Sequence, residues 1–362
     1  MPDKKIVWWQ PQIGKTERRL INQVLDDNYI NEGGLTTEFE EKLAKLLGVK
    51  QVIATTSGTV AIFLALKALG VGPGDEVIVP DITFVATANA VDLCGAKPIL
   101  VDIDPLTLNI SPDTVTKAIT SRTKAIVPVH YSGRAAKMDQ ILKIAKKHHL
   151  VVVEDAAEAL LSKYKGRYLG TLGNAGCFSF SPNKTITTGQ GGAIVTNDNK
   201  LATKLRGLKN QGRPPEGGDI YNSRGYNFRL TNLQAAIGLG QLGYLTKRTE
   251  RMKKINKLYT ENLQGVKGIS VIKFNTKEDE VSQWTDALTD RRDELIKYLA
   301  KYNIQCRAFW LPLHQQKPYK LPDVNFPQSI KISRKALWLP SCFSMKDGEV
   351  LKVCQNIRAF FE

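Results

Sequence analysis

The stretch that decides the fold lies at residues 151–192 and reads VVVEDAAEALLSKYKGRYLGTLGNAGCFSFSPNKTITTGQGG. Its apolar start, residues 151–153, is typical of a buried parallel strand, which is covered on both faces. Asp155 follows, so its carboxylate is expected at the carboxyl end of a strand, where open α/β sheets bind ligands. Lys184 comes 29 residues later, in a polar turn after a second strand-like run at residues 176–180. The sequence therefore predicts that an acid and a lysine meet in one crevice.

This pair of residues suits the chemistry of pyridoxal phosphate (PLP). A PLP enzyme needs a lysine amine that forms a Schiff base and a carboxylate that keeps the pyridine nitrogen protonated, because the pyridinium is the strong electron sink. Lys184 and Asp155 fit those two roles. Each residue taken alone has a plainer interpretation, since an Asp after a strand is often a helix N-cap and most lysines are solvated.

The same stretch also carries the pattern of a known family. EDAAEA at residues 154–159 and FSFSPNKTITTGQGG at residues 178–192 resemble the DegT/DnrJ/EryC1/StrS family of sugar aminotransferases, and the resemblance runs over about residues 6–361. It implies an α/β fold of fold type I, with a mostly parallel central sheet flanked by helices and a smaller C-terminal α+β domain. It also implies that Lys184 is the catalytic residue and that Asp155 binds the cofactor.

A phosphate site is predicted at residues 55–59, TTSGT, which precede an apolar helical run. The first N–H groups of a helix are free and lie at the positive end of its dipole, which suits an anion. Taken alone, this turn is an ordinary Ser/Thr N-cap. The resemblance implies that Gly58 and Thr59 contact the cofactor phosphate and that Ser179 adds a hydroxyl.

Two further residues are expected beside the cofactor ring. Phe84 falls just beyond a short strand at residues 76–80. An aromatic residue there is more often part of the core, yet the resemblance implies that it stacks on the pyridine ring. Glu158 is expected on the other face of the ring or near its hydroxyl.

Residues 225–232, GYNFRLTN, resemble a family element that reaches across a subunit interface. Local pattern alone favours an Asn-capped start to a buried helix. The resemblance instead implies that Asn227 contacts the cofactor phosphate of the other subunit. A homodimer with shared active sites is therefore expected.

The substrate pocket is expected near residues 309–314, FWLPLH, which are followed by Pro318 and Tyr319. This element resembles one that borders the sugar pocket in the family, which implies that His314 and Trp310 bind substrate. The alternative for His314 is a loop histidine that caps a proline turn.

The length of 362 residues exceeds what one core usually fills, so two domains are expected. We predict a large PLP-binding domain at residues 15–245 and a small C-terminal domain at residues 246–362, with residues 1–14 packing near it. Strand-like runs alternate with helical runs in the first part, as in a mostly parallel sheet. These runs are residues 76–80, 97–101, 125–129, 151–154, 176–180 and 193–196.

The composition indicates which kinds of binding partner and which cellular compartment to expect. The net charge of +16 would suit a nucleic acid or an anionic membrane, but the cations are scattered along helices, so neither partner is expected. No zinc spacing, P-loop or 18-residue apolar run occurs, so we expect no metal and no membrane span. The five cysteines are widely spaced in apolar contexts, which favours free thiols and the cytoplasm.

The resemblance implies transfer of an amino group from L-glutamate to a nucleotide-linked 4-keto-6-deoxy sugar, in polysaccharide biosynthesis. The segments at residues 162–166, 183–189 and 225–232 favour GDP-4-keto-6-deoxymannose, giving GDP-perosamine, while UDP- and dTDP-sugars remain alternatives. The chain departs from the family pattern at Gln190, where Glu is usual, and at residues 285–290, where a longer strand is usual. Two rivals are sugar dehydration, against which Lys184 speaks because those relatives carry histidine there, and a non-enzymatic basic regulator.

Overall fold

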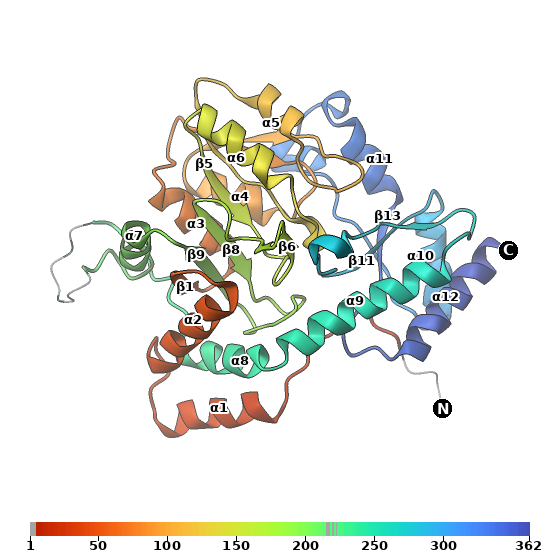
Figure 1. Cartoon of the computed structure of the whole chain (residues 1–362), viewed down its shortest axis with the longest axis horizontal. Coiled ribbons are helices and arrows are strands. Elements are labelled where there is room, and N and C mark those ends of the chain that lie inside the picture. The colour runs from red at the N-terminus through yellow and green to blue at the C-terminus, as the bar shows by residue number, and fades with distance from the viewer. Residues whose placement is uncertain (1–4, 215–217, 219–220, 222) are drawn as a thin grey trace.

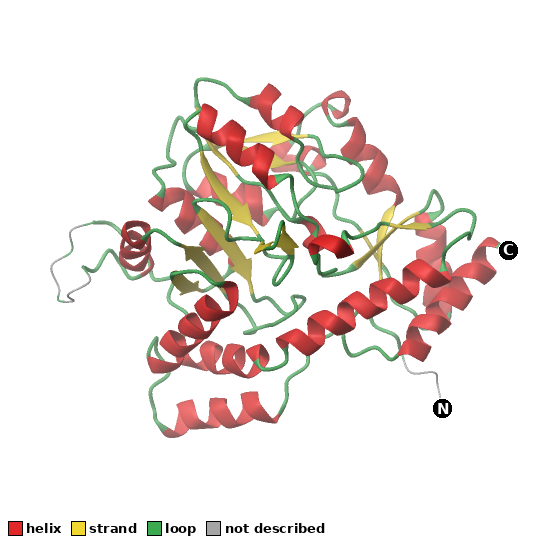
Figure 2. Cartoon of the chain, viewed as in Figure 1, coloured by secondary structure: helices red, strands yellow, loops and turns green. Residues whose placement is uncertain are grey.

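The computed structural model describes residues 5–214, 218, 221 and 223–362. A twisted sheet with helices on both faces fills one side of the molecule, and a smaller sheet lies beside it (Figures 1 and 2). The fold is α/β with a mostly parallel central sheet, as the sequence predicts.

The large sheet has seven strands, and six of them run in the same direction. Strand β9 is antiparallel to both of its neighbours, and the other neighbouring pairs are parallel. Asp155 at the end of β5 pairs with Cys177 of β8, so these two strands reach the same edge of the sheet. In spatial order the strands are β1 (Gln51–Thr55), β9 (Gly192–Thr196), β8 (Ala175–Ser179), β5 (Val151–Asp155), β4 (Thr123–Ile126), β2 (Glu76–Pro80) and β3 (Lys97–Val101).

Helices cover both faces of this sheet. Successive side chains of a strand point to opposite faces, so both sets of side chains are buried. On β5, Val153 packs with one set of helices and Val152 with the other. Each fully buried aliphatic side chain contributes roughly 1.5–3 kcal/mol. The first set comprises α3 (Gly58–Ala68), α4 (Ala86–Leu93) and α7 (Asn199–Lys209). The second comprises α2 (Gly34–Leu47), α5 (Pro112–Ala118), α6 (Met138–Lys147) and α8 (Asn232–Leu242), and α1 (Lys15–Asp26) packs on α8.

One expected strand is shorter than predicted. Residues 125–129 were expected as a strand, but β4 ends at Ile126. Pro128 has no N–H to donate to a ladder, which ends regular pairing there. Beyond it, Val129 keeps only an isolated bridge to Asp155, and the chain then enters a 3-10 turn, η1 (Tyr131–Gly133).

The second sheet is antiparallel and is reached through the long helix α9 (Leu245–Asn262), which Figure 1 shows running from the large sheet toward it. Its spatial order is β10 (Ser270–Val271), β11 (Thr285–Leu288), β13 (Ala336–Leu339) and β12 (Arg307–Ala308). Helices α10 (Arg292–Lys301), α11 (Pro327–Lys335) and α12 (Asp347–Phe361) accompany it, and β6 (Lys163–Tyr164) and β7 (Arg167–Tyr168) form a separate hairpin.

The N-terminal segment packs against this second sheet. Ile6 forms a parallel bridge with Ile304, and the Trp8 ring lies 5.7 Å from that of Trp338. The proposed boundary between two domains near residue 245 stays a prediction.

Candidate active site

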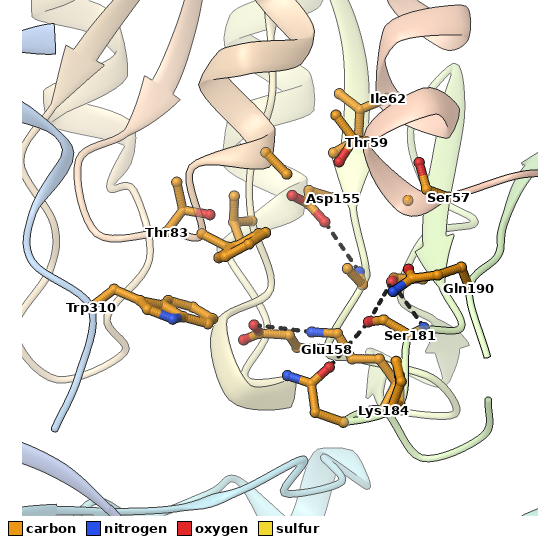
Figure 3. A pocket seen from close by; sticks show the side chains of 18 of the residues that line it. Ser57, Thr59, Ile62, Thr83, Asp155, Glu158, Ser181, Lys184, Gln190 and Trp310 are labelled. Atoms are coloured by element: carbon orange, nitrogen blue, oxygen red, sulfur yellow. Dashed lines mark hydrogen bonds and ion pairs between the residues drawn. The ribbon is translucent and has the colours of Figure 1, made fainter. Parts of the chain in front are cut away.

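A cavity of about 380 Å³ opens at the carboxyl ends of the parallel strands, and side chains from the second sheet close its other side (Figure 3). Most of the predicted site residues line this cavity. They are Gly58, Thr59, Phe84, Asp155, Glu158, Ser179, Lys184 and Trp310. Asn227 and His314 do not line it.

Lys184 and Glu158 form an ion pair inside the cavity. The Lys184 Nζ lies 3.3 Å from Glu158 Oε1 and 4.9 Å from the centre of the Trp284 ring. The other carboxylate oxygen of Glu158 accepts the Ser132 N–H at 2.8 Å. Burial raises the pKa of Glu158, although the charge of Lys184 acts in the opposite direction. The pair therefore places an amine beside a group that can take up a proton.

Asp155 is a buried carboxylate that faces the same cavity. The Thr87 hydroxyl donates to it at 2.7 Å and the Ala157 N–H at 3.1 Å. Burial raises its pKa, and these two bonds and the charge of Lys184 lower it. None of the ion pairs among the described residues includes Asp155. A cation brought against this carboxylate would lower its pKa further, and a protonated pyridine nitrogen is such a cation.

The amino end of α3 forms the anion-binding part of the cavity. Ser57 caps the helix by accepting the Val60 N–H at 3.2 Å. A Cβ at Gly58 would lie 2.8 Å from the Ser179 Cβ, so glycine lets the turn approach β8. The N–H groups of the first helical turn have no partner within the helix. Together with the Ser179 hydroxyl they suit a phosphate.

Phe84 and Trp310 form an aromatic wall. Phe84 is 50% exposed, and its ring centre lies 5.2 Å from that of Trp310. The Trp310 ring in turn packs 4.8 Å from the Trp338 ring of β13. The wall therefore joins the end of β2 to the second sheet and offers flat apolar surface to a ring.

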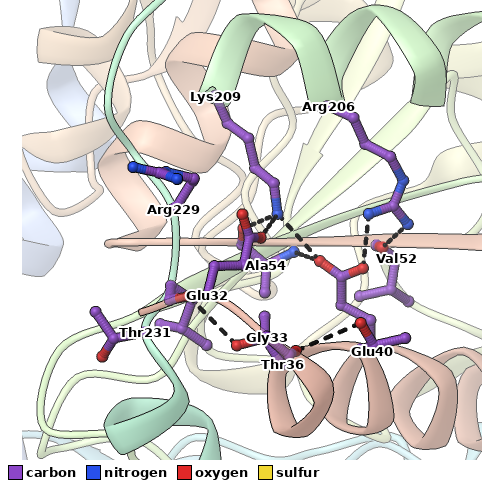
Figure 4. A network of polar contacts seen from close by, with 12 residues as sticks. Glu32, Gly33, Thr36, Glu40, Val52, Ala54, Arg206, Lys209, Arg229 and Thr231 are labelled. Carbon is purple, nitrogen blue, oxygen red and sulfur yellow. Dashed lines mark hydrogen bonds and ion pairs between the residues drawn. The ribbon is translucent and has the colours of Figure 1, made fainter. Parts of the chain in front are cut away.

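The structure places Asn227 away from this cavity. Its side chain is exposed and accepts a hydrogen bond from Arg229 Nε at 3.1 Å. The next residue, Phe228, donates its N–H to the Lys209 carbonyl at 2.9 Å. The Lys209 side chain is buried in a network with two glutamates, Glu32 and Glu40 (Figure 4). The segment is thus held firmly while Asn227 points outward.

His314 occupies a different position from the one predicted. Its side chain is fully buried, with Nδ1 at 2.7 Å from Asp81 and Nε2 at 3.2 Å from Asp323, and its ring stacks on Phe326 at 4.4 Å. A direct contact with substrate does not fit this burial. Instead His314 ties the segment that carries Trp310 to Asp81, which directly follows β2.

Several cavity residues were not predicted from the sequence as site residues. The main ones are Ser57, Ser181, Asn183, Gln190 and Arg307. The first four lie in segments that the sequence pattern singles out, but no separate role was assigned to their side chains, and the segment of Arg307 gave no signal. Outside the lining, Gln283 fixes both sides of Lys184, accepting from the Thr185 hydroxyl at 2.7 Å and donating to the Asn183 carbonyl at 3.1 Å.

In the part of the chain that the structure describes, no group of three or more His, Cys, Asp or Glu side chains could hold a metal ion, and no helix is long and apolar enough to cross a membrane. The five cysteines are free.

Comparison with known proteins identifies the family. Residues 11–358 match the DegT/DnrJ/EryC1/StrS aminotransferase family. The chain belongs to this family. A GDP-perosamine synthase of Caulobacter vibrioides is 42% identical over 317 residues, 85% of each chain, and one of Escherichia coli O157:H7 is 37% identical over 365 residues, 99% of each chain. A Streptococcus pneumoniae protein solved in a PLP form is 26% identical, with a TM-score of 0.93 over 98% of both chains.

This DegT/DnrJ/EryC1/StrS protein is a PLP-dependent sugar aminotransferase. The residues present fit the cofactor. A lysine, a helix amino end and a buried carboxylate that has no ion-pair partner among the described residues meet in one cavity. Asp155 would hold the ring nitrogen, Lys184 the aldehyde carbon, and Gly58, Thr59 and Ser179 the phosphate.

Proposed function

We propose that the enzyme transfers the amino group of L-glutamate to carbon 4 of a nucleotide-linked 4-keto-6-deoxy sugar. GDP-4-keto-6-deoxymannose is the preferred acceptor, and GDP-perosamine is the product. The identity of 42% and 37% to two GDP-perosamine synthases supports the guanine nucleotide. UDP- and dTDP-linked sugars are the alternatives.

The observation that carries the reaction type is the position of the Lys184 amine inside the cavity, paired with Glu158. When bound, PLP supplies the electron sink that makes the α-proton of the donor acidic. Lys184 Nζ would take the proton from the α-carbon of the donor in the first half-reaction and would deliver a proton to carbon 4 of the sugar in the second. Glu158, 3.3 Å away, would stabilise the positive charge of the amine whenever it carries a proton. Asp155 would keep the ring nitrogen of the cofactor protonated, and the Phe84–Trp310 wall would orient its flat ring.

A mass-spectrometric panel tests this proposal. The holoenzyme is given L-glutamate and, in separate reactions, the GDP-, UDP- and dTDP-linked 4-keto-6-deoxy sugars. We expect amination of the GDP-sugar at the highest kcat/KM. Faster amination of a UDP- or dTDP-sugar would replace the nucleotide assignment, and no amination of any of the three sugars would overturn the sugar assignment.

We also propose that the enzyme is a homodimer and that Asn227 reaches the cofactor phosphate in the partner subunit. The exposed position of this side chain outside its own cavity supports the proposal. Asn227→Ala and Lys184→Ala proteins, each weakly active or inactive, are mixed under subunit exchange. If the site is shared, activity should return, because one site of each heterodimer carries both substitutions and the other site carries neither. No gain in verified heterodimers would contradict a contact across the interface.

A further inference from the structure

The cavity contains one charge that the cofactor does not use. Four charged side chains line it, Asp155, Glu158, Lys184 and Arg307. Lys184 pairs with Glu158, and Asp155 suits the ring nitrogen. Arg307 is the remaining charged residue of the four. None of the ion pairs or side-chain hydrogen bonds among the described residues includes its guanidinium. An arginine without an acidic partner at the wall of a cavity is a binding group for an anion.

Backbone pairing and two tryptophan rings hold Arg307 in place. It lies on β12 at the edge of the second sheet, where its backbone pairs with Trp338 of β13. The guanidinium carbon lies 5.1 Å from the centre of the Trp8 ring and 5.7 Å from that of Trp338. Flat aromatic faces attract a guanidinium and leave its N–H groups free at the edge. The residue itself is exposed, so a ligand can reach it.

The cofactor phosphate is not the anion that this site suits. The phosphate turn at Ser57 and Thr59 forms the start of α3, which packs on the large sheet. Arg307 lies on β12 of the second sheet, three residues before Trp310. Figure 3 shows Trp310 and Ser57 on opposite sides of the pocket, with Asp155 and Glu158 between them. An anion bound at Arg307 would therefore lie on the Trp310 side of the pocket and not at the phosphate turn.

We propose that Arg307 binds an anionic group of the incoming substrate and so directs its reacting carbon toward Lys184. The group is a carboxylate or a phosphate, because both offer the paired oxygens that a guanidinium binds with two hydrogen bonds. The donor glutamate carries the first and the nucleotide sugar the second. This inference rests on the proposed function for the identity of these two substrates.

Two variants and a control test the role of Arg307. Arg307→Gln removes the charge, and Arg307→Lys keeps the charge but loses the two-pronged geometry. Arg358→Gln is the matched control, because Arg358 is exposed on α12 and outside the cavity. For each holoenzyme we would measure bound PLP, the change in the visible absorption band on adding glutamate alone, and steady-state amination of the GDP-sugar.

We expect Arg307→Gln to raise the KM of at least one substrate by about 10- to 100-fold, with Arg307→Lys in between and bound PLP unchanged. A rise for glutamate alone identifies the carboxylate, a rise for the nucleotide sugar alone identifies the phosphate, and a rise for both identifies one site used in turn. An unchanged KM for both substrates, or a loss of PLP, would overturn the inference. If the wild type aminates no nucleotide sugar, the proposed function fails, while the glutamate half-reaction still tests Arg307.

Discussion

The cavity has two halves that are built in different ways. The cofactor half, with Asp155, Lys184 and the Ser57 turn, stands on strand ends and a helix end of the large sheet. The substrate half, with Trp310 and Arg307, stands on a two-residue strand and a loop of the second sheet. Strands and helices hold the residues for the chemistry in place, whereas loops determine which substrate binds. This division is common in enzymes. The following variants should separate the two halves.

The largest effect should follow removal of the amine in the cofactor half. Lys184→Ala should lower kcat by about 10³- to 10⁴-fold, because positioned proton transfer alone contributes up to about 10⁴. Steady-state kinetics measure the loss, and circular dichroism checks the fold. Lys165→Ala is the control, since that lysine is 60% exposed and pairs with Asp139 outside the cavity. Borohydride reduction and peptide mapping of the wild type should find the pyridoxyl label on Lys184, and a label on another lysine would refute the assignment.

The next effect concerns the junction between the halves. Arg134, which directly follows η1, forms a buried ion pair with Asp286 of β11, and their side chains are 2% and 0% exposed. Asp286 also accepts the Ser132 hydroxyl at 3.0 Å, next to the N–H that holds Glu158. Arg134→Ala leaves a buried carboxylate unpaired, so we expect a loss of about 3–5 kcal/mol in the free energy of unfolding.

Denaturant unfolding measures this loss. The exposed pair of Arg291 and Glu294 supplies the control, because Arg291→Ala should cost less than about 1 kcal/mol. Replacing both members of the buried pair, as in Arg134→Met with Asp286→Leu, should recover part of the stability. A cost for Arg134→Ala no larger than that of the control would contradict the junction role.

Asp155→Asn should lower activity and yet stabilise the cofactor-free protein. An opposite charge shifts a pKa by about 1–3 units, so losing the carboxylate should reduce kcat by roughly 10- to 1000-fold. Burial raises the pKa of Asp155 above its ordinary value of 3.8. The folded state then holds more protons than the unfolded state, so stability falls as the pH rises from 3.8 through the raised value. The Asp155→Asn substitution removes this loss of stability at higher pH, because asparagine does not ionise.

Thermal melts of cofactor-free wild type and Asp155→Asn at several pH values, with kinetics of the holoenzymes, check both effects. A variant with full activity, or one that is less stable than the wild type at neutral pH, would contradict the role of Asp155 as a buried charge that awaits a cation.

The smallest effect should be confined to the substrate half. His314→Ala removes the bond to Asp81 and loosens the segment that carries Trp310. We expect the KM of the nucleotide sugar to rise about tenfold or less, since one hydrogen bond to a charged group contributes roughly 1.5–3 kcal/mol and part of it can be replaced by water. Bound PLP should not change. His314→Asn, which keeps a donor near Asp81, should recover part of the affinity; an equal loss in both variants would argue against the bond.

The sequence predicts the cofactor half better than the substrate half for a physical reason. Asp155 and Lys184 follow strands whose apolar runs are visible locally, and Ser57 and Gly58 carry a helix-start pattern. His314 depends on Asp81, which is 233 positions away, so local pattern could not show that its ring is buried. Arg307 was missed because its neighbours, Trp8 and Trp338, come from distant segments. The strand expected at residues 125–129 ended early because Pro128 interrupts it.

Transfer of a labelled nitrogen shows whether the enzyme moves the amino group of glutamate to the nucleotide sugar. The holoenzyme is incubated with ¹⁵N-glutamate and GDP-4-keto-6-deoxymannose, and the nucleotide sugar and the 2-oxo acid are measured by mass spectrometry. We expect a GDP-linked 4-amino sugar that carries one ¹⁵N, formed in equal amount with 2-oxoglutarate. Conversion of glutamate with no ¹⁵N in any nucleotide sugar would contradict it.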